Sequence, residues 1–334
     1  MAAALISRRT LFASLAASAL AARRAAAFLE DSESTVAIPN PLTQTLGGKQ
    51  FWADELFFHE WHIQRHVWTG HCRLLDGRQR RFASGTFDHC AERLDEIKRR
   101  EKLPPMRGRA VVVLHGLGRS SGSMRKICDY LRNEGGYSVC NVTYPTTRGG
   151  VADHAATLAK IVEGLDGIDE LNFVGHSLGN LVIRHWLADR ADPTNGHRPD
   201  PRLKRIVMLG PPNHGAKLAE VFLTNDLAEL IVGKAGGQIG RFDQLEMKLA
   251  TPACEFGIIA GGRETLLGYN PLLGGDNDLV VGVESTRLAG ASDFAVLPIT
   301  HTWMMDDRTV QEYTLRFLER GYFTSADERK GIDR

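Results

Sequence analysis

The stretch LNFVGHSLGN, Leu171 to Asn180, decides the fold of this 334-residue chain. It begins as a short apolar run, passes through Gly175-His176-Ser177-Leu178-Gly179, and continues into the apolar spacing of a helix. A strand that passes directly into a helix needs a tight turn, and glycine at both flanks removes side chains that would clash there. The pattern predicts that Ser177 stands on this turn as a nucleophile. The alternative is a glycine-rich turn with an idle serine.

Short apolar runs recur along the chain on both sides of this turn. Helical patterns separate them, such as the apolar face that runs from Met124 to Leu131. Nearly continuous apolar strands between amphipathic helices are typical of a parallel sheet covered on both faces. The sequence therefore predicts a three-layer α/β fold, with a mostly parallel sheet whose strand ends meet at one edge. The predicted strands are residues 109–115, 137–143, 171–175, 205–209 and 256–260.

A serine nucleophile needs two backbone N–H groups that face the oxyanion formed when it attacks a carbonyl carbon. One belongs to the residue after the serine, Leu178, and the other to the loop after an earlier strand. That loop reads His115-Gly116-Leu117-Gly118, so we expect Leu117 to supply the second N–H. Gly116 allows the backbone to approach closely. His115 precedes the nucleophile, and we expect it to close the loop rather than act as a base.

The general base is expected to follow both the nucleophile and the acid in the chain. Four histidines follow Ser177, and His301 is the one placed after an apolar run (294–299) and before a final helix (307–319). The position predicts that His301 is the base; the alternative is a solvated loop histidine. The other three are His185 in the helix after the nucleophile, His197 in a polar loop and His214 on the border of the pocket.

The acid that orients the base should follow the strand at 256–260. Asp278 opens the segment Asp278-Leu279-Val280-Val281 and is our first choice, because an acid on such a loop can accept the imidazole N–H. Asp276, two residues earlier, is the second choice. Both lie in a turn-rich segment that any protein could use as a plain turn. One Asp-x-Asp triplet lacks the remaining ligands of a calcium loop, so we expect no metal. The remaining acidic candidates are Glu264, Glu284 and Asp293.

These motifs together resemble the lipase and esterase branch of the α/β-hydrolase superfamily, over about residues 109–320. Similar bacterial enzymes carry a Gly-x-Pro-Asn-His-Gly segment that borders the pocket, and here residues 210–215 read Gly-Pro-Pro-Asn-His-Gly. Relatives often have glycine after the acid, where this chain has Leu279. The resemblance implies an α/β-hydrolase fold. The residues expected to line the pocket are His115, Gly116, His176, Asn213 and His214.

The resemblance also implies hydrolysis of carboxylic esters through an acyl-enzyme, with Ser177 attacking, His301 carrying the proton and Asp278 orienting His301. No cofactor is implied, and the expected partner is a small-molecule or lipid ester. Contact with a lipid interface stays open. One alternative is an acyltransferase, thioesterase or amidase with the same triad. Another is a non-catalytic binding module on this scaffold.

The N-terminus has a different composition from the rest. Arg8 and Arg9 precede an apolar run to Ala22, and small residues end at Ala27. This is typical of a twin-arginine export signal, so we expect a periplasmic or extracellular protein, or an anchored one if the signal stays uncleaved. An uncleaved Ala-rich anchor and a mitochondrial-type presequence are the alternatives. The 41 basic and 40 acidic residues are spread along the chain, and nothing indicates nucleic-acid binding.

Three regions are therefore expected: the signal at 1–27, a linker with a small N-terminal β/α extension at 28–105, and the α/β-hydrolase domain at 106–325. Alternating residues 61–68 and a turn at 75–78 predict a small strand pair in the extension, and residues 89–102 a helix. The apolar pattern of 218–232 fits either a lid over the pocket or an ordinary core helix. Export would permit disulfides among the five cysteines, but buried free thiols are as compatible with the pattern.

Overall fold

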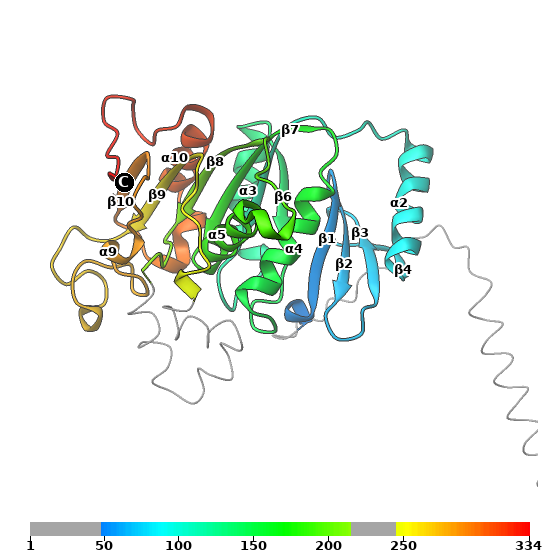
Figure 1. Cartoon of the computed structure of the whole chain (residues 1–334), viewed down its shortest axis with the longest axis horizontal. Coiled ribbons are helices and arrows are strands. Elements are labelled where there is room, and N and C mark those ends of the chain that lie inside the picture. The colour runs from blue at the N-terminus through cyan, green and yellow to red at the C-terminus, as the bar shows by residue number, and fades with distance from the viewer. Residues whose placement is uncertain (1–47, 215–244) are drawn as a thin grey trace, which may run out of the picture. The chain divides into compact units, whose positions relative to one another are not determined.

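The computed structural model describes residues 48–214 and 245–334 (Figure 1). Its main sheet has six strands in the order β10-β9-β8-β7-β5-β6, and every neighbouring pair is parallel. The predicted parallel sheet is thus confirmed. Its strands are β5 (Gly108–Leu114), β6 (Ser138–Val142), β7 (Ile168–His176), β8 (Leu203–Leu209), β9 (Glu255–Gly261) and β10 (Asp293–Leu297).

Helices cover both faces of this sheet, which explains why its strands read as continuous apolar runs. Alternate residues of β5 enter two separate cores: Val112 packs in the core that includes α4 and α5, and Val113 in the core that includes α3 and α10. Figure 1 shows these helices around the sheet. The helices are α3 (Arg125–Asn133), α4 (Val151–Glu163), α5 (Leu178–Ala191), α9 (Val283–Thr286) and α10 (Arg308–Arg320).

The order of the strands reverses beside β5, which is the second strand from one edge of the main sheet. The chain passes from β5 outward to β6 and then returns to the other side of β5 as β7. In open α/β sheets, ligands bind beyond the carboxyl ends of the strands at such a reversal. The loops after β5 and β7 carry the His-Gly-Leu-Gly and Gly-His-Ser-Leu-Gly motifs, so the fold brings both motifs to this reversal.

The N-terminal extension is larger than the strand pair expected from the sequence. It forms a separate four-stranded sheet in the order β1-β2-β3-β4, antiparallel throughout. The sequences of the short β3 and β4 did not predict strands. In β4 the burial of the side chains does not alternate, because most of them are half-exposed. The expected turn between them is present, with Asp76 N–H donating to the Arg80 carbonyl at 3.1 Å. The strands are β1 (Trp52–Phe58), β2 (Trp61–His66), β3 (Cys72–Leu75) and β4 (Arg81–Gly85).

Helix α2 (Phe87–Glu101) covers one face of this sheet and buries Leu94 and Ile97 in a third apolar core. Thr86 caps it, since its side chain accepts the His89 N–H at 3.2 Å. The extension joins the main sheet at its β6 end. There the N–H of Asp54 donates to the Thr143 carbonyl at 2.9 Å, and the N–H of Thr143 donates to Asp54 Oδ2 at 2.6 Å.

Two predicted segments, the export signal at 1–27 and the apolar pattern at 218–232, lie outside the described residues, as does nearly all of the linker. Within the described ranges, no helix has the length and apolar character needed to cross a membrane. All five cysteines are free thiols, and four of them are buried. The domain boundaries stay predictions.

Candidate active site

Ser177 lies on a strained turn between β7 and α5. Its φ of 51° and ψ of −120° fall in a region that L-residues rarely adopt and that concentrates at functional sites. The turn is tied to the next strand, because the Ser177 N–H donates to the Leu209 carbonyl at 3.0 Å. Ser177 is 7% exposed. The strain and burial are those of a serine held in one orientation at the sheet edge.

The glycines beside the serine are there for space rather than for positive φ. A Cβ at Gly175 would lie 2.9 Å from Asn180 Cγ. A Cβ at Gly179 would lie 2.7 Å from the backbone oxygen of Leu114, at the end of β5. Any larger residue would therefore push the first turn of α5 away from the sheet. The predicted reason for glycine at both flanks holds.

His301 and Asp278 form a buried pair on two different loops. Nδ1 of His301 lies 2.7 Å from Oδ2 of Asp278. Asp278 is fully buried and His301 is 7% exposed. The two loops are also tied through their backbones, because the His301 N–H donates to the Asp278 carbonyl at 2.9 Å. A carboxylate oxygen accepts, so Nδ1 carries the proton and Nε2 keeps the lone pair that a base needs.

The second carboxylate oxygen of Asp278 is held by its own loop. Oδ1 accepts the N–H groups of Val280 at 3.0 Å and Val281 at 2.7 Å. This tight loop forces Leu279 to a φ of 89°, where an L-residue is strained and glycine is not. Leu279, which stands where similar enzymes often have glycine, therefore adds backbone strain to the loop. The strain does not displace Asp278 from His301.

Asp276 is hydrogen-bonded to other groups. Its carboxylate accepts the N–H groups of Arg263 and Glu264, each at 2.8 Å, and so closes the loop after β9. Asp293 has a similar structural place, accepting the N–H of Phe323 at 2.7 Å. Of the acidic candidates, the structure brings Asp278 alone into hydrogen bonding with His301 among the residues it describes.

His301 and Ser177 meet the same short segment of backbone at the end of β8. The Ser177 N–H donates a hydrogen bond to the Leu209 carbonyl. The next residue, Gly210, packs against the imidazole, because a Cβ at Gly210 would be 3.0 Å from His301 Nδ1. Gly210 has a φ of 50°. The sequence analysis missed this role of Gly210, whose signal is its place directly after an apolar strand. The ring of His176 gives a second link, with its centroid 4.6 Å from that of His301.

The loop after β5 approaches the serine closely. A Cβ at Gly116 would lie 3.1 Å from Ser177 Cβ, so only glycine lets this backbone pass. Leu178 begins α5, where the first N–H groups have no partner within the helix. In the described part of the chain, the N–H of neither Leu117 nor Leu178 donates to a protein group.

The predicted pocket residues divide into two groups. His176 lies between Gly116 and His301: its Nε2 lies 3.0 Å from the His301 carbonyl. A carbonyl only accepts, so this nitrogen donates. Burial, and secondarily the nearby His301, hold the pKa of His176 well below its ordinary value. His115 is fully buried and stacks on Tyr144, with ring centroids 4.4 Å apart, which fits its expected structural place.

Asn213 and His214 follow β8 and form the second group. Asn213 is fully buried, and its amide is used at both ends: Oδ1 accepts from Arg184 Nη1 at 3.0 Å, and Nδ2 donates to the Thr286 carbonyl at 2.8 Å. His214 is exposed and lies 3.8 Å from Glu246. Asn213 thus acts as an internal brace, and His214 faces solvent.

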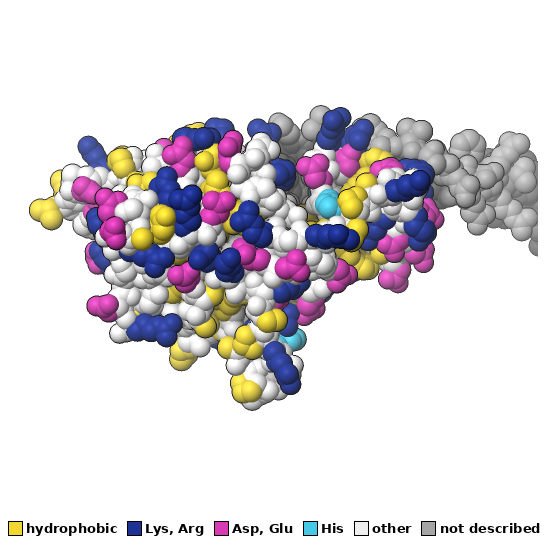
Figure 2. Space-filling model, turned by 90° about the horizontal axis from the view of Figure 1, so that it is seen from above, with side chains coloured by type: hydrophobic (Ala, Val, Ile, Leu, Met, Phe, Trp, Pro, Cys, Tyr) yellow, Lys and Arg dark blue, Asp and Glu magenta, His cyan; other side chains and the backbone are white. Residues whose placement is uncertain are grey.

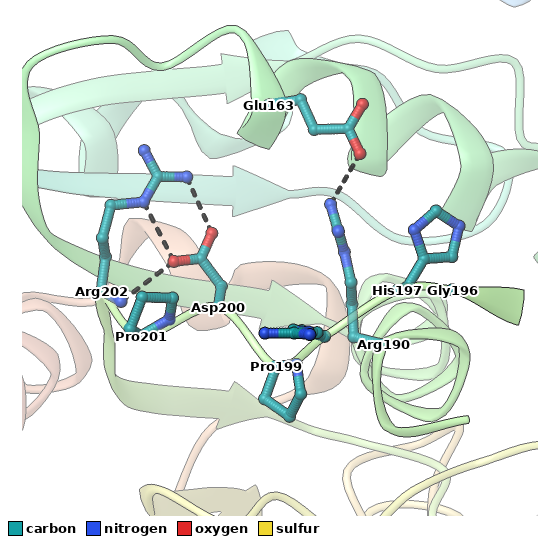
Figure 3. Close-up of a pocket in the computed structure, with 9 residues that line it drawn as sticks. Glu163, Arg190, Gly196, His197, Pro199, Asp200, Pro201 and Arg202 are labelled. Atoms are coloured by element: carbon teal, nitrogen blue, oxygen red, sulfur yellow. Dashed lines mark hydrogen bonds and ion pairs between the residues drawn. The ribbon is translucent and has the colours of Figure 1, made fainter. Parts of the chain in front are cut away.

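A separate pocket of about 430 Å³ lies at the loop between α5 and β8, and Figure 3 shows its lining. Its charged groups are largely paired with each other: Arg190 with Glu163 at 2.8 Å and Arg202 with Asp200 at 2.7 Å. The loop precedes β8, whereas Leu209 ends it. The pocket therefore lies toward the opposite end of the sheet from Ser177 and is not part of its site.

Basic and acidic side chains are interspersed on the face that Figure 2 shows, without a large region of one sign. This distribution agrees with the spread of charge in the sequence.

No family model and no curated protein matches the sequence. Among solved structures, the chain is similar to a lin2722 gene product of Listeria innocua, at 17% identity and a TM-score of 0.44 over 68% of this chain and 98% of that one. It is also similar to the Pyrococcus furiosus esterase PF2001, at 14% identity and a TM-score of 0.41 over 87% and 99%. A third is Est1E of Butyrivibrio proteoclasticus, solved with ferulic acid, at 15% identity and a TM-score of 0.41 over 66% and 93%.

The fold is identified from the sheet and the turns of this chain. The sequence predicts a parallel sheet covered by helices and a strand–turn–helix segment around Ser177, and the structure has both. The chain has the α/β-hydrolase fold.

Proposed function

We propose that the protein is a serine hydrolase that cleaves carboxylic esters, with Ser177, His301 and Asp278 as its triad. The observation that carries the proposal is the buried His301–Asp278 pair, 2.7 Å apart, beside the backbone segment that also holds the strained Ser177 turn. A serine alone on a tight turn is common. An oriented, buried imidazole at the same sheet edge supplies the base that makes a serine nucleophilic.

In the first half of the reaction, Ser177 Oγ forms a bond to the ester carbonyl carbon while its proton passes to His301 Nε2. The resulting imidazolium is stabilised by Asp278. The carbon–oxygen bond to the alcohol then breaks, and His301 returns the proton to that oxygen. In the second half, water gives its proton to His301 and attacks the acyl-enzyme, which releases the acid and restores Ser177.

The N–H groups of Leu117 and Leu178 stabilise the oxyanion in both halves. Removal of one such donor in a comparable site costs about 10²–10³ in kcat. Leu178 adds the positive end of the α5 dipole, because it is the first residue of that helix. The steps use no metal or cofactor.

The test is a panel of p-nitrophenyl esters, from acetyl to long acyl, with the wild type, Ser177→Ala and the control Ser325→Ala. Ser177→Ala is expected to abolish hydrolysis and to stay folded, whereas the control keeps full activity. A fluorophosphonate probe should label wild type at Ser177, as read by peptide mass. Ester hydrolysis that survives Ser177→Ala would disprove the proposal. Parallel reactions with an alcohol acceptor show whether acyl transfer competes with hydrolysis.

For the N-terminus we propose export through the twin-arginine-like segment 1–27. The sequence pattern supports it. Fractionation of cells that express the wild type and an Arg8→Lys, Arg9→Lys variant tests it, since export should be lost in the variant. Equal distribution of both proteins would contradict it.

A further inference from the structure

The N-terminal extension reaches the proposed oxyanion loop through one side chain. Gln50 lies in a 3-10 turn, η1 (Gly48–Phe51), directly before β1. Its Nε2 donates to the Arg119 carbonyl at 2.7 Å. Arg119 closes the turn that contains Leu117, because the Arg119 N–H donates to the Gly116 carbonyl at 3.2 Å. Gln50 therefore holds the far end of the turn whose N–H is expected to stabilise the oxyanion.

The other end of the Gln50 amide holds the neighbouring loop, after β6. Gln50 Oε1 accepts from the Thr146 hydroxyl, and from the N–H and hydroxyl of Thr147, each at 3.2 Å. Thr146 is fully buried, and its Oγ1 also accepts the Gly118 N–H at 3.0 Å. One amide thus bridges the loops after β5 and β6.

These contacts form a closed circuit around the turn. The Gly118 N–H donates to Thr146 Oγ1, the Thr146 hydroxyl donates to Gln50 Oε1, and Gln50 Nε2 donates back to Arg119. A reversed amide would set its NH₂ against the Thr147 N–H and its oxygen against the Arg119 carbonyl, so the amide has one favourable orientation. Gly118 has a φ of 67°, a conformation that glycine adopts without strain.

Gln50 is itself held in place. The Val67 N–H donates to the carbonyl of the adjacent Phe51 at 2.9 Å, and the guanidinium of Arg148 lies 4.9 Å from the Phe51 ring centroid. Through the bonds of Asp54 to Thr143, β1 is fixed to the end of β6 as well. The extension therefore presents Gln50 from a rigid base.

We infer that Gln50 is a positioning residue, which aims the Leu117 N–H at the oxyanion and makes the extension a working part of the site. This inference rests on the proposed serine hydrolase function. An interaction realised in the transition state raises kcat, whereas one shared with the ground state lowers KM. Loss of Gln50 should therefore lower kcat and leave KM nearly unchanged.

The test uses the full chain and the variant Gln50→Met, which keeps the length of the side chain and removes its hydrogen bonds. The matched control is Gln79→Met, in the hairpin between β3 and β4 at the other end of the extension sheet. We expect kcat for p-nitrophenyl acetate to fall about tenfold to a hundredfold in Gln50→Met, because a small displacement of a catalytic group costs up to about 10². The control should stay within twofold.

A trifluoromethyl ketone forms a hemiketal with Ser177 and places a charged oxygen in the oxyanion position. Its affinity for Gln50→Met should be lower than for the wild type by the same factor as kcat. If Gln50 only supported the fold, Gln50→Met would have a lower melting temperature and an unchanged affinity for the ketone. A second pair, Thr146→Val and Thr146→Ser, decides the matter if Gln50→Met does not fold: the valine variant should repeat the loss and the serine variant should rescue it.

Labelling of wild-type Ser177 by the fluorophosphonate tests the proposed hydrolase function separately from the positioning role of Gln50. If wild type is labelled and hydrolyses esters, but kcat and ketone affinity of Gln50→Met match the control, this inference is wrong and the proposed function stands. If wild type is neither labelled nor active on any ester, both fall.

Discussion

Replacement of Asp278 by asparagine tests the acid directly, because the structure fixes how an amide would sit there. Oδ1 of Asp278 accepts two backbone N–H groups, those of Val280 and Val281. An asparagine must keep its oxygen at that position, so its NH₂ faces His301 Nδ1. The imidazole then has to accept at Nδ1 and carry its proton on Nε2. That tautomer cannot take a proton from Ser177.

The size of the effect follows from the cost of the reverse orientation. To restore the useful tautomer, the NH₂ would have to oppose two N–H donors, at about 1–3 kcal/mol for each bond lost. The total of about 2–6 kcal/mol corresponds to a loss of about thirtyfold to about 10⁴-fold in kcat. The upper part of this range is what an analogous substitution in a serine protease triad costs.

Hydrolysis of p-nitrophenyl acetate at saturating ester measures kcat, and urea unfolding measures stability. Asp276→Asn is the matched control, two residues away on the same loop. It opposes an NH₂ to the Glu264 N–H, so stability should fall by about 1–3 kcal/mol while kcat stays within about threefold. If Asp278→Asn kept kcat within threefold of wild type, or Asp276→Asn lost more activity, the assignment of the acid would be refuted.

Three further outcomes are expected from the same structure. Ser177→Gly and Ser177→Ala should both be inactive, but the glycine variant should unfold at higher urea, by about 1 kcal/mol or more, because it relieves the φ of 51° that alanine keeps; equal stability would contradict strain at the turn. Gly179→Ala should lose about 1–3 kcal/mol, since its Cβ would lie 2.7 Å from the Leu114 oxygen, and urea unfolding would show no loss if the helix shifts without cost. Burial lowers the pKa of His154 from 6.5 to about 4 in the folded protein. As the pH falls between these two values, His154 is protonated in the unfolded chain but not in the folded one. Stability should drop there by about 3 kcal/mol on account of this residue, and His154→Gln should flatten the slope of unfolding free energy against pH where exposed His71→Gln does not.

The main sheet was predictable because its strands are buried on both faces and therefore read as unbroken apolar runs. The serine turn was predictable because glycines mark it. The N-terminal sheet was only partly predicted. In β2, His62, Ile63 and Gln64 are all buried, so burial does not follow the alternation of the sequence. The polar members are held by hydrogen bonds that no pattern reveals, such as those from Arg73 to Gln64 at 2.7 and 3.0 Å.

The choice between Asp276 and Asp278 shows where sequence spacing stops being informative. Two residues separate them, and both lie in a loop rich in turn residues. Their difference comes from which backbone N–H groups the loop turns toward each carboxylate, and this depends on the positive φ of Leu279. Leucine gives no sign of such a conformation. The link from Gln50 to Arg119 was equally hidden, since 69 residues separate the two.

The attachment of the extension at β6 also has a consequence for association between molecules. A strand at the rim of a sheet offers unpaired amide groups to any passing chain. Ser138–Val142 has no charged residue or proline to discourage such pairing. Asp54 and the start of β1 occupy part of that rim through Thr143. A protein shortened to begin after the extension would therefore be expected to self-associate through this rim, even at concentrations where the full chain stays dispersed.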